Sequence, residues 1–404
     1  MSINRWLILA ASIVCNLCAG SAYAWSVFQS PLMSRFHWTP SDVSLAFTLS
    51  LVVLPLAMIG FGKIQDLHGP KRIILLGGLL YGGAIISTGF ASSLGMLYLT
   101  YGLLGGLGLG AIYAPAIANT VKWFPDKKGL ASGLIAAGLG GGAIIWAPIA
   151  TLLIQTYDVS TAFKLTGSLY LFIIVAAASL VKAPPPGYSP VGWTPPVIKQ
   201  SASFAINTDW KTMLHQPLFY ILWLMYALGA IAGLMIMGHA ASIGQENIHL
   251  TTTTAALAVS LLAIANTSGR IFWGYLSDKF GRYNSLTAIY LVISIMMLIL
   301  PTITTFGWFI VIIMAVGLCF GGLLGIFPII TAEHFGIENL GMNYGIMFTA
   351  FGLAAIIGPR LAARVKELTA GYTEAFLISA ALSACGIIMI LLLRYRSHRQ
   401  TFNQ

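Results

Sequence analysis

Charged side chains are scarce in this chain. Only 8% of its 404 residues are charged, and only 11 residues are acidic. Soluble domains carry about 25% charged residues, so the composition excludes an ordinary soluble protein. The acidic residues also fall in loops or at the ends of apolar runs, which leaves no carboxylate inside a run to act as a proton relay. They are Asp42, Asp66, Asp126, Asp158, Asp209, Glu246, Asp278, Glu333, Glu338, Glu367 and Glu374.

Cysteine and the usual catalytic motifs are sparse as well. The four cysteines all lie in apolar runs, which argues against a disulfide framework. Cys15 and Cys18 have the spacing of a metal-binding pair, but no further Cys or His lies near them, so we expect no metal site. The glycine clusters match neither a dinucleotide-binding loop nor a Walker sequence. The sequence therefore predicts no cofactor and no enzyme activity.

Apolar sequence, in contrast, is abundant. Hydrophobic residues make up 58% of the chain, and the mean hydropathy is +0.86. About twelve runs reach the roughly 20 residues that cross a bilayer, so we predict an all-α integral membrane protein with about twelve transmembrane helices. The runs lie at about residues 6–28, 43–62, 73–94, 96–118, 130–154, 162–181, 217–240, 253–274, 284–304, 307–330, 340–360 and 375–393.

The net charge of +10 invites a nucleic-acid interpretation, but the positions of the cations argue against it. With the amino terminus inside, about 15 Lys and Arg residues fall in cytoplasmic segments and about 5 in external ones. This bias predicts cytoplasmic termini and an inner-membrane protein that binds no nucleic acid. The first run resembles a signal peptide, with Ala22-Tyr23-Ala24 as a cleavage site. Its removal would misplace the carboxyl-terminal arginines, so we expect a retained helix.

A proline-rich connector divides the chain into halves. We predict a six-helix bundle at 1–181, a cytoplasmic connector at 182–216, a second six-helix bundle at 217–394 and a cytoplasmic tail at 395–404. Each half repeats one motif, Gly-x-x-x-Asp-x-x-Gly followed by a basic residue. Either aspartate could cap a neighbouring helix and pair with a basic residue across the halves, as a gate; the alternative is an ordinary tight turn. The motif residues concerned are Asp66, Lys71, Arg72, Asp278 and Arg282.

Arg270 is the one ionised residue deep inside an apolar run. A guanidinium there costs roughly 2.5–3.5 kcal/mol on insertion scales, and no acidic residue lies in any run to neutralise it. A carboxylate ligand could supply the missing charge, and the polar residues Asn266 and Ser268 lie beside it in sequence. The alternative is that Arg270 snorkels to the interface near Tyr275. We favour the ligand interpretation.

Several segments resemble the oxalate:formate antiporter family of the major facilitator superfamily, over essentially the whole chain. They are Lys122-Trp123-Phe124-Pro125-Asp126-Lys127-Lys128-Gly129-Leu130-Ala131, Gly238-His239-Ala240, Ser268-Gly269-Arg270-Ile271-Phe272-Trp273-Gly274, Asn343-Tyr344-Gly345 and the connector around Gly187-Tyr188 and Gly192-Trp193. The resemblance implies the major facilitator fold, with two six-helix pseudo-repeats and a central site. It also implies a secondary transporter of small carboxylates.

The resemblance also shows where this chain departs from the oxalate carrier. That carrier holds oxalate between an arginine, which corresponds to Arg270, and a lysine whose position holds Phe351 here. Ala22, Phe320 and Leu324 stand where it has glutamine, tryptophan and tyrosine. Tyr23, Trp25 and Tyr113 keep its aromatic character. One cation matches one carboxylate, and an apolar wall suits a short alkyl group, so the expected substrate is a monocarboxylate such as lactate or pyruvate.

Other roles for these residues remain open. Tyr344, Phe348 and Phe351 follow helical spacing, which is more often packing than pocket. His239 is a candidate for proton coupling, although a histidine that hydrogen-bonds a neighbouring helix is the simpler interpretation.

The partners that we expect are a small carboxylate and the bilayer around a monomer, with proton symport and anion exchange both open. The rival functions are an oxalate:formate antiporter and a transporter-like anion sensor.

Overall fold

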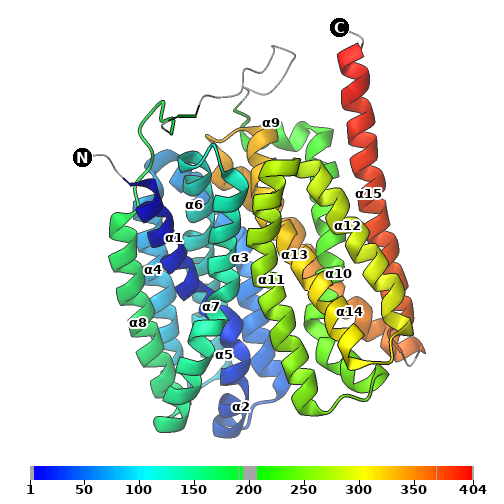
Figure 1. Cartoon of the computed structure of the whole chain (residues 1–404). Helices are drawn as coiled ribbons and strands as arrows, with labels where there is room; N and C mark the ends of the chain where they lie inside the picture. The colour runs from blue at the N-terminus through cyan, green and yellow to red at the C-terminus, as the bar shows by residue number, and fades with distance from the viewer. Residues whose placement is uncertain (1–3, 191, 194–206, 370, 403–404) are drawn as a thin grey trace.

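The protein is a bundle of long helices in two halves (Figure 1). The structure, a computed structural model, describes residues 4–190, 192–193, 207–369 and 371–402. Twelve helices in this part of the chain are long and apolar enough to cross a membrane, which confirms the predicted all-α membrane architecture.

The first half contains α1 (Arg5–Ala19), η1 (Gly20–Ala24), α2 (Trp25–Phe36), α3 (Pro40–His68), α4 (Pro70–Thr88), α5 (Leu94–Leu97), η2 (Tyr98–Gly105), α6 (Gly106–Trp123), α7 (Lys128–Thr156) and α8 (Val159–Leu180). The second contains α9 (Trp210–His215), α10 (Pro217–Asn247), α11 (Thr252–Phe280), α12 (Arg282–Ile299), η3 (Leu300–Thr302), α13 (Phe306–Phe335), α14 (Leu340–Thr369) and α15 (Thr373–Phe402). The predicted tail at 395–404 thus begins inside α15, which continues to Phe402.

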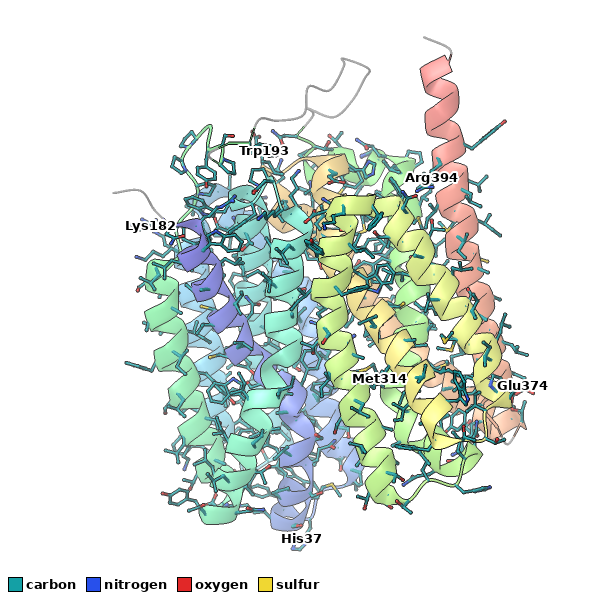
Figure 2. All side chains as sticks on the ribbon, viewed as in Figure 1. His37, Lys182, Trp193, Met314, Glu374 and Arg394 are labelled. Carbon is teal, nitrogen blue, oxygen red and sulfur yellow. The ribbon has the colours of Figure 1, made fainter. Side chains whose placement is uncertain are left out.

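The start of α1, the end of α15 and the described parts of the connector lie at one end of the bundle (Figure 1), which we call the terminus face; the opposite end is the far face. Lys182, Trp193 and Arg394 lie toward the terminus face, whereas His37 and Glu374 lie at the far face (Figure 2). Because each half has an even number of spans, it begins and ends on the same face. This arrangement places the repeated Gly-x-x-x-Asp-x-x-Gly turns, at the ends of α3 and α11, on the terminus face.

Two of the spans are interrupted. The first changes from α-helix to a tighter 3₁₀ stretch at Gly20–Ala24 and then back to α-helix. The fourth includes a wider π-helical stretch at Tyr98–Gly105. Such departures inside a helix often mark functional positions. Tyr23 lies on the first of them, so its backbone is not that of a regular helix.

The halves meet mainly along two helix pairs, α7 with α11 and α3 with α14, with smaller contacts from α6 and α13. The pairs are related by the repeat, since α3 and α11 each carry one copy of the motif. Figure 1 shows α7 beside α11 at the boundary between the halves. A side-chain contact across either helix pair therefore depends on the relative position of the two halves.

Candidate substrate site and the contacts that close it

Arg270 lies at the boundary between the halves. Its side chain belongs to α11 in the second half, and the residue is only 3% exposed. Nη1 donates to the carbonyl oxygen of Ala136 on α7 at 2.6 Å, and Nη2 donates to Asn266 Oδ1 at 3.0 Å. Nε has no partner, and no carboxylate pairs with the guanidinium among the described residues. The structure does not agree with the snorkelling interpretation, because the guanidinium is buried and donates a hydrogen bond to the other half.

The guanidinium fits against α7 because residue 140 is glycine. A Cβ atom at Gly140 would lie 2.5 Å from Arg270 Cζ and 2.8 Å from both terminal nitrogens. Real Cβ contacts are longer, so any side chain there would displace the guanidinium. The glycine-rich sequence of α7 therefore makes room for the buried cation.

Only one of the two polar neighbours expected beside Arg270 faces it. Asn266 precedes Arg270 by one helical turn, is buried, and accepts its hydrogen bond. Ser268 is exposed on the opposite side of α11. Ser268 is close to Arg270 in sequence but not in space, because two residues along an α-helix turn a side chain by about 200°.

Aromatic rings line the boundary near this cation. Phe348 on α14 is the centre of the cluster, with Tyr113 from α6 at 5.8 Å and Tyr344 at 5.6 Å between ring centroids, both edge to face. Phe351 stacks on Phe348 at 4.9 Å and lies parallel to Phe320 of α13 at 6.3 Å. The contact between Tyr113 and Phe348 joins the two halves. Four of the predicted pocket residues, Tyr113, Tyr344, Phe351 and Phe320, thus belong to one cluster.

The other predicted residues are less closely tied to it. Leu324 is buried on α13, one helical turn beyond Phe320. Tyr23 is half-buried on the 3₁₀ stretch, and Ala22 beside it is buried and accepts a hydrogen bond from the Tyr101 hydroxyl at 3.3 Å.

Sequence reasoning missed Tyr226 of α10, which stacks on Phe327 at 4.1 Å and meets Phe348 at 6.2 Å. The sequence signal that could have indicated it is a hydroxyl in the middle of the seventh apolar run.

Asp66 joins the halves at the terminus face. Its two carboxylate oxygens accept hydrogen bonds from the backbone N–H groups of Gly341 and Met342, at 3.2 and 3.1 Å. These are the second and third residues of α14, whose first-turn N–H groups have no partner within the helix. The negative charge also faces the positive end of the helix dipole. Lys122 Nζ lies 3.8 Å from Asp66 Oδ1 and donates to the carbonyl oxygen of Glu338.

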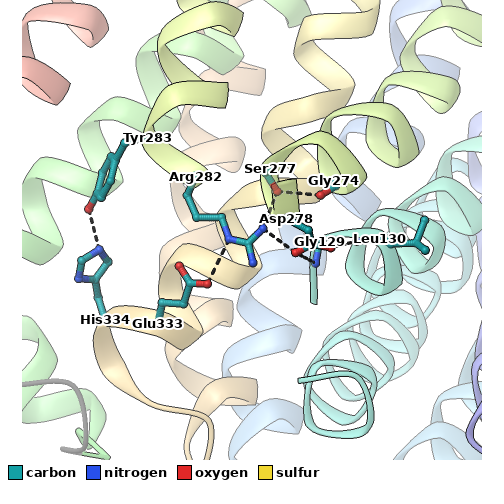
Figure 3. Close-up of polar contacts among 9 residues, drawn as sticks. All are labelled: Gly129, Leu130, Gly274, Ser277, Asp278, Arg282, Tyr283, Glu333 and His334. Atoms are coloured by element: carbon teal, nitrogen blue, oxygen red, sulfur yellow. Dashed lines mark hydrogen bonds and ion pairs between the residues drawn. The ribbon is translucent and has the colours of Figure 1, made fainter. Parts of the chain in front are cut away.

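Asp278 makes the equivalent contact from the other half. It accepts the N–H groups of Gly129 and Leu130, both at 2.9 Å, which are again the second and third residues of a helix, α7. Arg282 Nη1 donates to Asp278 Oδ1 at 2.7 Å, and its Nε donates to Glu333 at 3.1 Å, as Figure 3 shows. The two motif turns share one geometry, since Gly69 and Gly281 adopt positive φ values of 83° and 85°, which favour glycine.

These contacts correct the expected gate in two respects. Each aspartate crosses the halves through helix backbone N–H groups, while its basic partner, Lys122 or Arg282, belongs to its own half. Lys71 and Arg72 are exposed on the first turn of α4 and form no ion pair in the described part of the chain. Lys122 and Glu333 were missed. Lys122 opens the Lys122-Trp123-Phe124-Pro125 segment, whereas Glu333 carries no local signal beyond its place at the end of a span.

Three other family-like residues, Trp123, Asn343 and Asp126, make hydrogen bonds at the terminus face. Trp123 Nε1 donates to the carbonyl oxygen of Lys182 at 2.8 Å, where the connector leaves the first half. Asn343 Nδ2 donates to the carbonyl oxygen of Thr208 at 2.9 Å, where the connector reaches the second half. Asp126 pairs through both oxygens with Arg5. Burial acts to raise the pKa of Asp126, but the hydrogen bonds from Arg5 and the backbone outweigh it and hold the pKa below its usual value.

His239 lies away from the aspartate contacts, toward the far-face end of α10. Its Nε2 is 2.9 Å from the carbonyl oxygen of Pro359 on α14, in the same half, and its ring lies 5.9 Å from that of Tyr372. The bond to a neighbouring helix is the simpler of the two arrangements weighed for this residue. The structure describes no contact between His239 and Arg270.

Every cross-half hydrogen bond among the described residues lies either at the terminus face or at Arg270. The ion pairs near the far face, Arg35 with Asp158 and Lys366 with Glu246, each stay within one half. The hydrogen bonds that join the halves therefore lie at the terminus face and at Arg270, and none lies at the far face among the described residues. This fold and this buried cation define a multi-pass membrane protein whose two helical bundles close on a polar site.

Comparison with known proteins identifies the family. The Major Facilitator Superfamily model matches residues 9–359 and 245–404, so the chain belongs to the major facilitator superfamily. It is 32% identical to the uncharacterized MFS-type transporter YhjX of Escherichia coli (strain K12), over 87% of this chain and 86% of that protein. It is 29% identical to the oxalate:formate antiporter of Oxalobacter formigenes (94% and 89% covered) and 26% identical to apicoplast pyruvate carrier 1 of Toxoplasma gondii (87% and 75%).

Solved structures agree on the fold. The crystal structure of the MFS transporter FucP in the outward conformation superposes with a TM-score of 0.71 at 17% identity, covering 95% of this chain and 98% of that one. The family and its relatives are transporters, so the chain is a multi-pass membrane transporter and not an enzyme.

Proposed function

We propose that the protein is a secondary transporter of small organic monocarboxylates, such as lactate or pyruvate. One observation carries the proposal: Arg270 is buried at the boundary of the halves with no carboxylate partner and an unpaired Nε. A buried charge requires compensation, and a carboxylate offers a guanidinium two charge-assisted hydrogen bonds. Similarity to the oxalate:formate antiporter, the apicoplast pyruvate carrier and human monocarboxylate transporter 12 supports an organic anion as that partner.

The choice of a monocarboxylate rests on the surroundings of the cation. Phe351 is only 5% exposed and lies between Phe348 and Phe320, where the resemblance implies a second cation in the oxalate carrier. A dianion beside Arg270 alone would keep one charge uncompensated in a poorly solvated site. A short alkyl group, in contrast, gains from contact with the rings. The tyrosines Tyr23, Tyr113 and Tyr344 are the hydroxyl donors of this proposed site.

Transport would follow alternating access, with the aspartate contacts as the gate. Asp66 and Asp278 hold the terminus face closed by capping α14 and α7. Opening that face requires both caps to break while the far face closes. By the charge bias we place the terminus face, with both termini, in the cytoplasm of a cell whose inner membrane holds the protein. The structure is then the state that faces outward.

We propose that substrate transport is coupled to a proton or a counter-anion without the use of a buried carboxylate. All eleven acidic residues lie at a helix end or between helices. An empty site with Arg270 is cationic and should reorient slowly, whereas a bound monoanion neutralises it. Anion exchange and symport with a proton both satisfy this requirement, the latter by way of His239 or water.

Uptake into proteoliposomes tests the proposal. Labelled lactate, pyruvate, formate and oxalate would be offered to purified protein, with counterflow to separate transport from binding. We expect lactate or pyruvate to exchange fastest. Faster exchange of oxalate with formate would establish the second candidate, which the 29% identity to the oxalate:formate antiporter favours. Binding without flux would indicate an anion sensor.

A further inference from the structure

Tyr226 of α10 carries a buried hydroxyl without a well-aligned hydrogen-bond partner in the protein. The residue is 0% exposed, and its hydroxyl has no hydrogen-bond partner. Buried tyrosine hydroxyls usually find a partner, because an unpaired buried polar group is unfavourable. Its neighbour in the fold, Tyr290, follows the usual pattern and donates to the carbonyl oxygen of Met225 at 2.6 Å. The contrast indicates that the Tyr226 hydroxyl is available to a ligand that is not part of the chain.

Two more tyrosines share both its neighbour and its lack of a partner. Tyr113, Tyr226 and Tyr344 all meet the ring of Phe348, at 5.8, 6.2 and 5.6 Å between centroids and at interplanar angles of 64°, 66° and 62°. All three hydroxyls are buried and none forms a well-aligned hydrogen bond, although the Tyr344 hydroxyl lies close to those of Tyr113 and Tyr226. They come from α6, α10 and α14, so three helices and both halves converge on one ring.

These hydroxyls lie in the same region of the protein as the cation. The Tyr226 hydroxyl lies next to the Tyr344 hydroxyl and within electrostatic range of Arg270, Tyr113 and Tyr23. Arg270 uses two of its N–H groups on Ala136 and Asn266, and since a guanidinium has five, three stay open. A carboxylate accepts about four hydrogen bonds. The open guanidinium N–H groups and the three hydroxyls can therefore satisfy a carboxylate and one further oxygen.

We propose that Tyr226 is a specificity-determining substrate contact. With Tyr113 and Tyr344, its hydroxyl binds the oxygen on the carbon next to the carboxylate, while Arg270 binds the carboxylate itself. The inference rests on the proposed function and deepens it. It divides monocarboxylates into those with an oxygen at the second carbon, which use the tyrosines, and simple alkyl carboxylates, which do not. Phe348 positions the three rings.

Lactate and propionate make the sharpest pair of probes, because they differ only by the hydroxyl on the second carbon. The variant Tyr226→Phe keeps the ring and removes the hydroxyl. We expect the ratio of kcat/KM for lactate to that for propionate to fall on the order of tenfold in proteoliposomes, as the loss of one hydrogen bond implies. Without substrate, the variant should unfold at the same temperature as the wild type or higher, because it removes an unpaired buried group.

Tyr290→Phe is the matched control. It removes a buried hydroxyl that is already paired within the protein, so it should lower the unfolding temperature and leave the lactate-to-propionate ratio unchanged. An unchanged ratio in Tyr226→Phe, or an equal loss for both anions, would overturn the role of Tyr226 while wild-type uptake still supports the proposed function. If the wild type carries neither anion, both proposals fall.

Discussion

Arg270 on α11 donates a hydrogen bond to the carbonyl oxygen of Ala136 on α7, and this contact crosses the boundary between the halves at 2.6 Å. The residue proposed to bind substrate is therefore also a residue that holds the halves together. A bound carboxylate would compete for the same guanidinium, so binding and rearrangement of the halves share one side chain. Because the acceptor is a neutral carbonyl, a charged ligand oxygen is the stronger partner.

A methyl group at Gly140 should displace this guanidinium without unfolding the protein. In Gly140→Ala the new Cβ would meet Arg270 Cζ at 2.5 Å, and a flexible side chain can move away. A displacement of about 1 Å at a binding group can lower activity on the order of a hundredfold. We expect a large loss of lactate uptake with near-normal thermal stability. Gly83→Ala, with nothing within 4 Å of its Cβ, is the control and should transport normally; equal uptake by both variants would exclude a tight fit at Gly140.

A lysine at Phe351 should change the charge preference of the site. Phe351→Lys adds a second cation beside the proposed carboxylate site, so oxalate binding should improve and lactate uptake should fall. The measurement is competition of each unlabelled anion against labelled lactate. Phe351→Leu keeps the site apolar and should keep the lactate preference. If the lysine variant loses stability with no change in selectivity, Phe351 is a packing residue and the argument for a monocarboxylate loses its main support.

Loss of either motif aspartate should loosen the terminus face. Asp278→Asn weakens the cap on α7 and the pair with Arg282, and Asp66→Asn weakens the cap on α14. A charge at a helix N-terminus contributes about 1 kcal/mol, so a cysteine placed at Met342 should be alkylated from that face about fivefold faster in Asp66→Asn. Lys71→Gln, at an exposed and unpaired position, should change nothing. Equal labelling in all variants would contradict the gate.

Net transport should be electroneutral. Because a monoanion neutralises the cationic empty site, the loaded site carries no charge across, whether the return step carries another anion or a proton accompanies the substrate. Proteoliposomes with separately imposed pH and electrical gradients provide the measurement, and a pH gradient or a counter-anion should drive accumulation. Accumulation driven by membrane potential alone, independent of pH and of any counter-anion, is the opposite result.

The features that the sequence could predict are those with a local or repeated signal. Twelve long apolar runs specify twelve spans, because a bilayer fixes the required length. The isolation of Arg270 is visible in sequence because no acidic residue falls within any of the predicted apolar runs. The second copy of the aspartate motif indicated a shared role, and both copies do contact the opposite half in the same register. Each of these inferences needed only composition, spacing or repetition.

What could not be predicted depends on contacts between distant segments. From the sequence alone, Tyr226 is interpreted as a packing residue. Only the fold shows that three helices bring unpaired hydroxyls to Phe348. The 3₁₀ stretch at Gly20–Ala24 lies inside a continuous apolar run and leaves the hydropathy unchanged. Lys122 pairs with Asp66, and Glu333 pairs with Arg282. Each partner lies more than fifty positions away in another helix, and sequence spacing implies neither pair.

Counterflow of labelled lactate with Arg270→Gln tests the central claim most directly. Purified wild type, Arg270→Gln and Arg270→Lys would be compared in proteoliposomes, with Lys63→Gln as an exposed charge control. We expect no counterflow with Arg270→Gln despite normal insertion, and little with Arg270→Lys, because an ammonium lacks the planar fork of the guanidinium. Near-normal counterflow with Arg270→Gln would contradict the account, since the buried cation would then not be the partner of the transported anion.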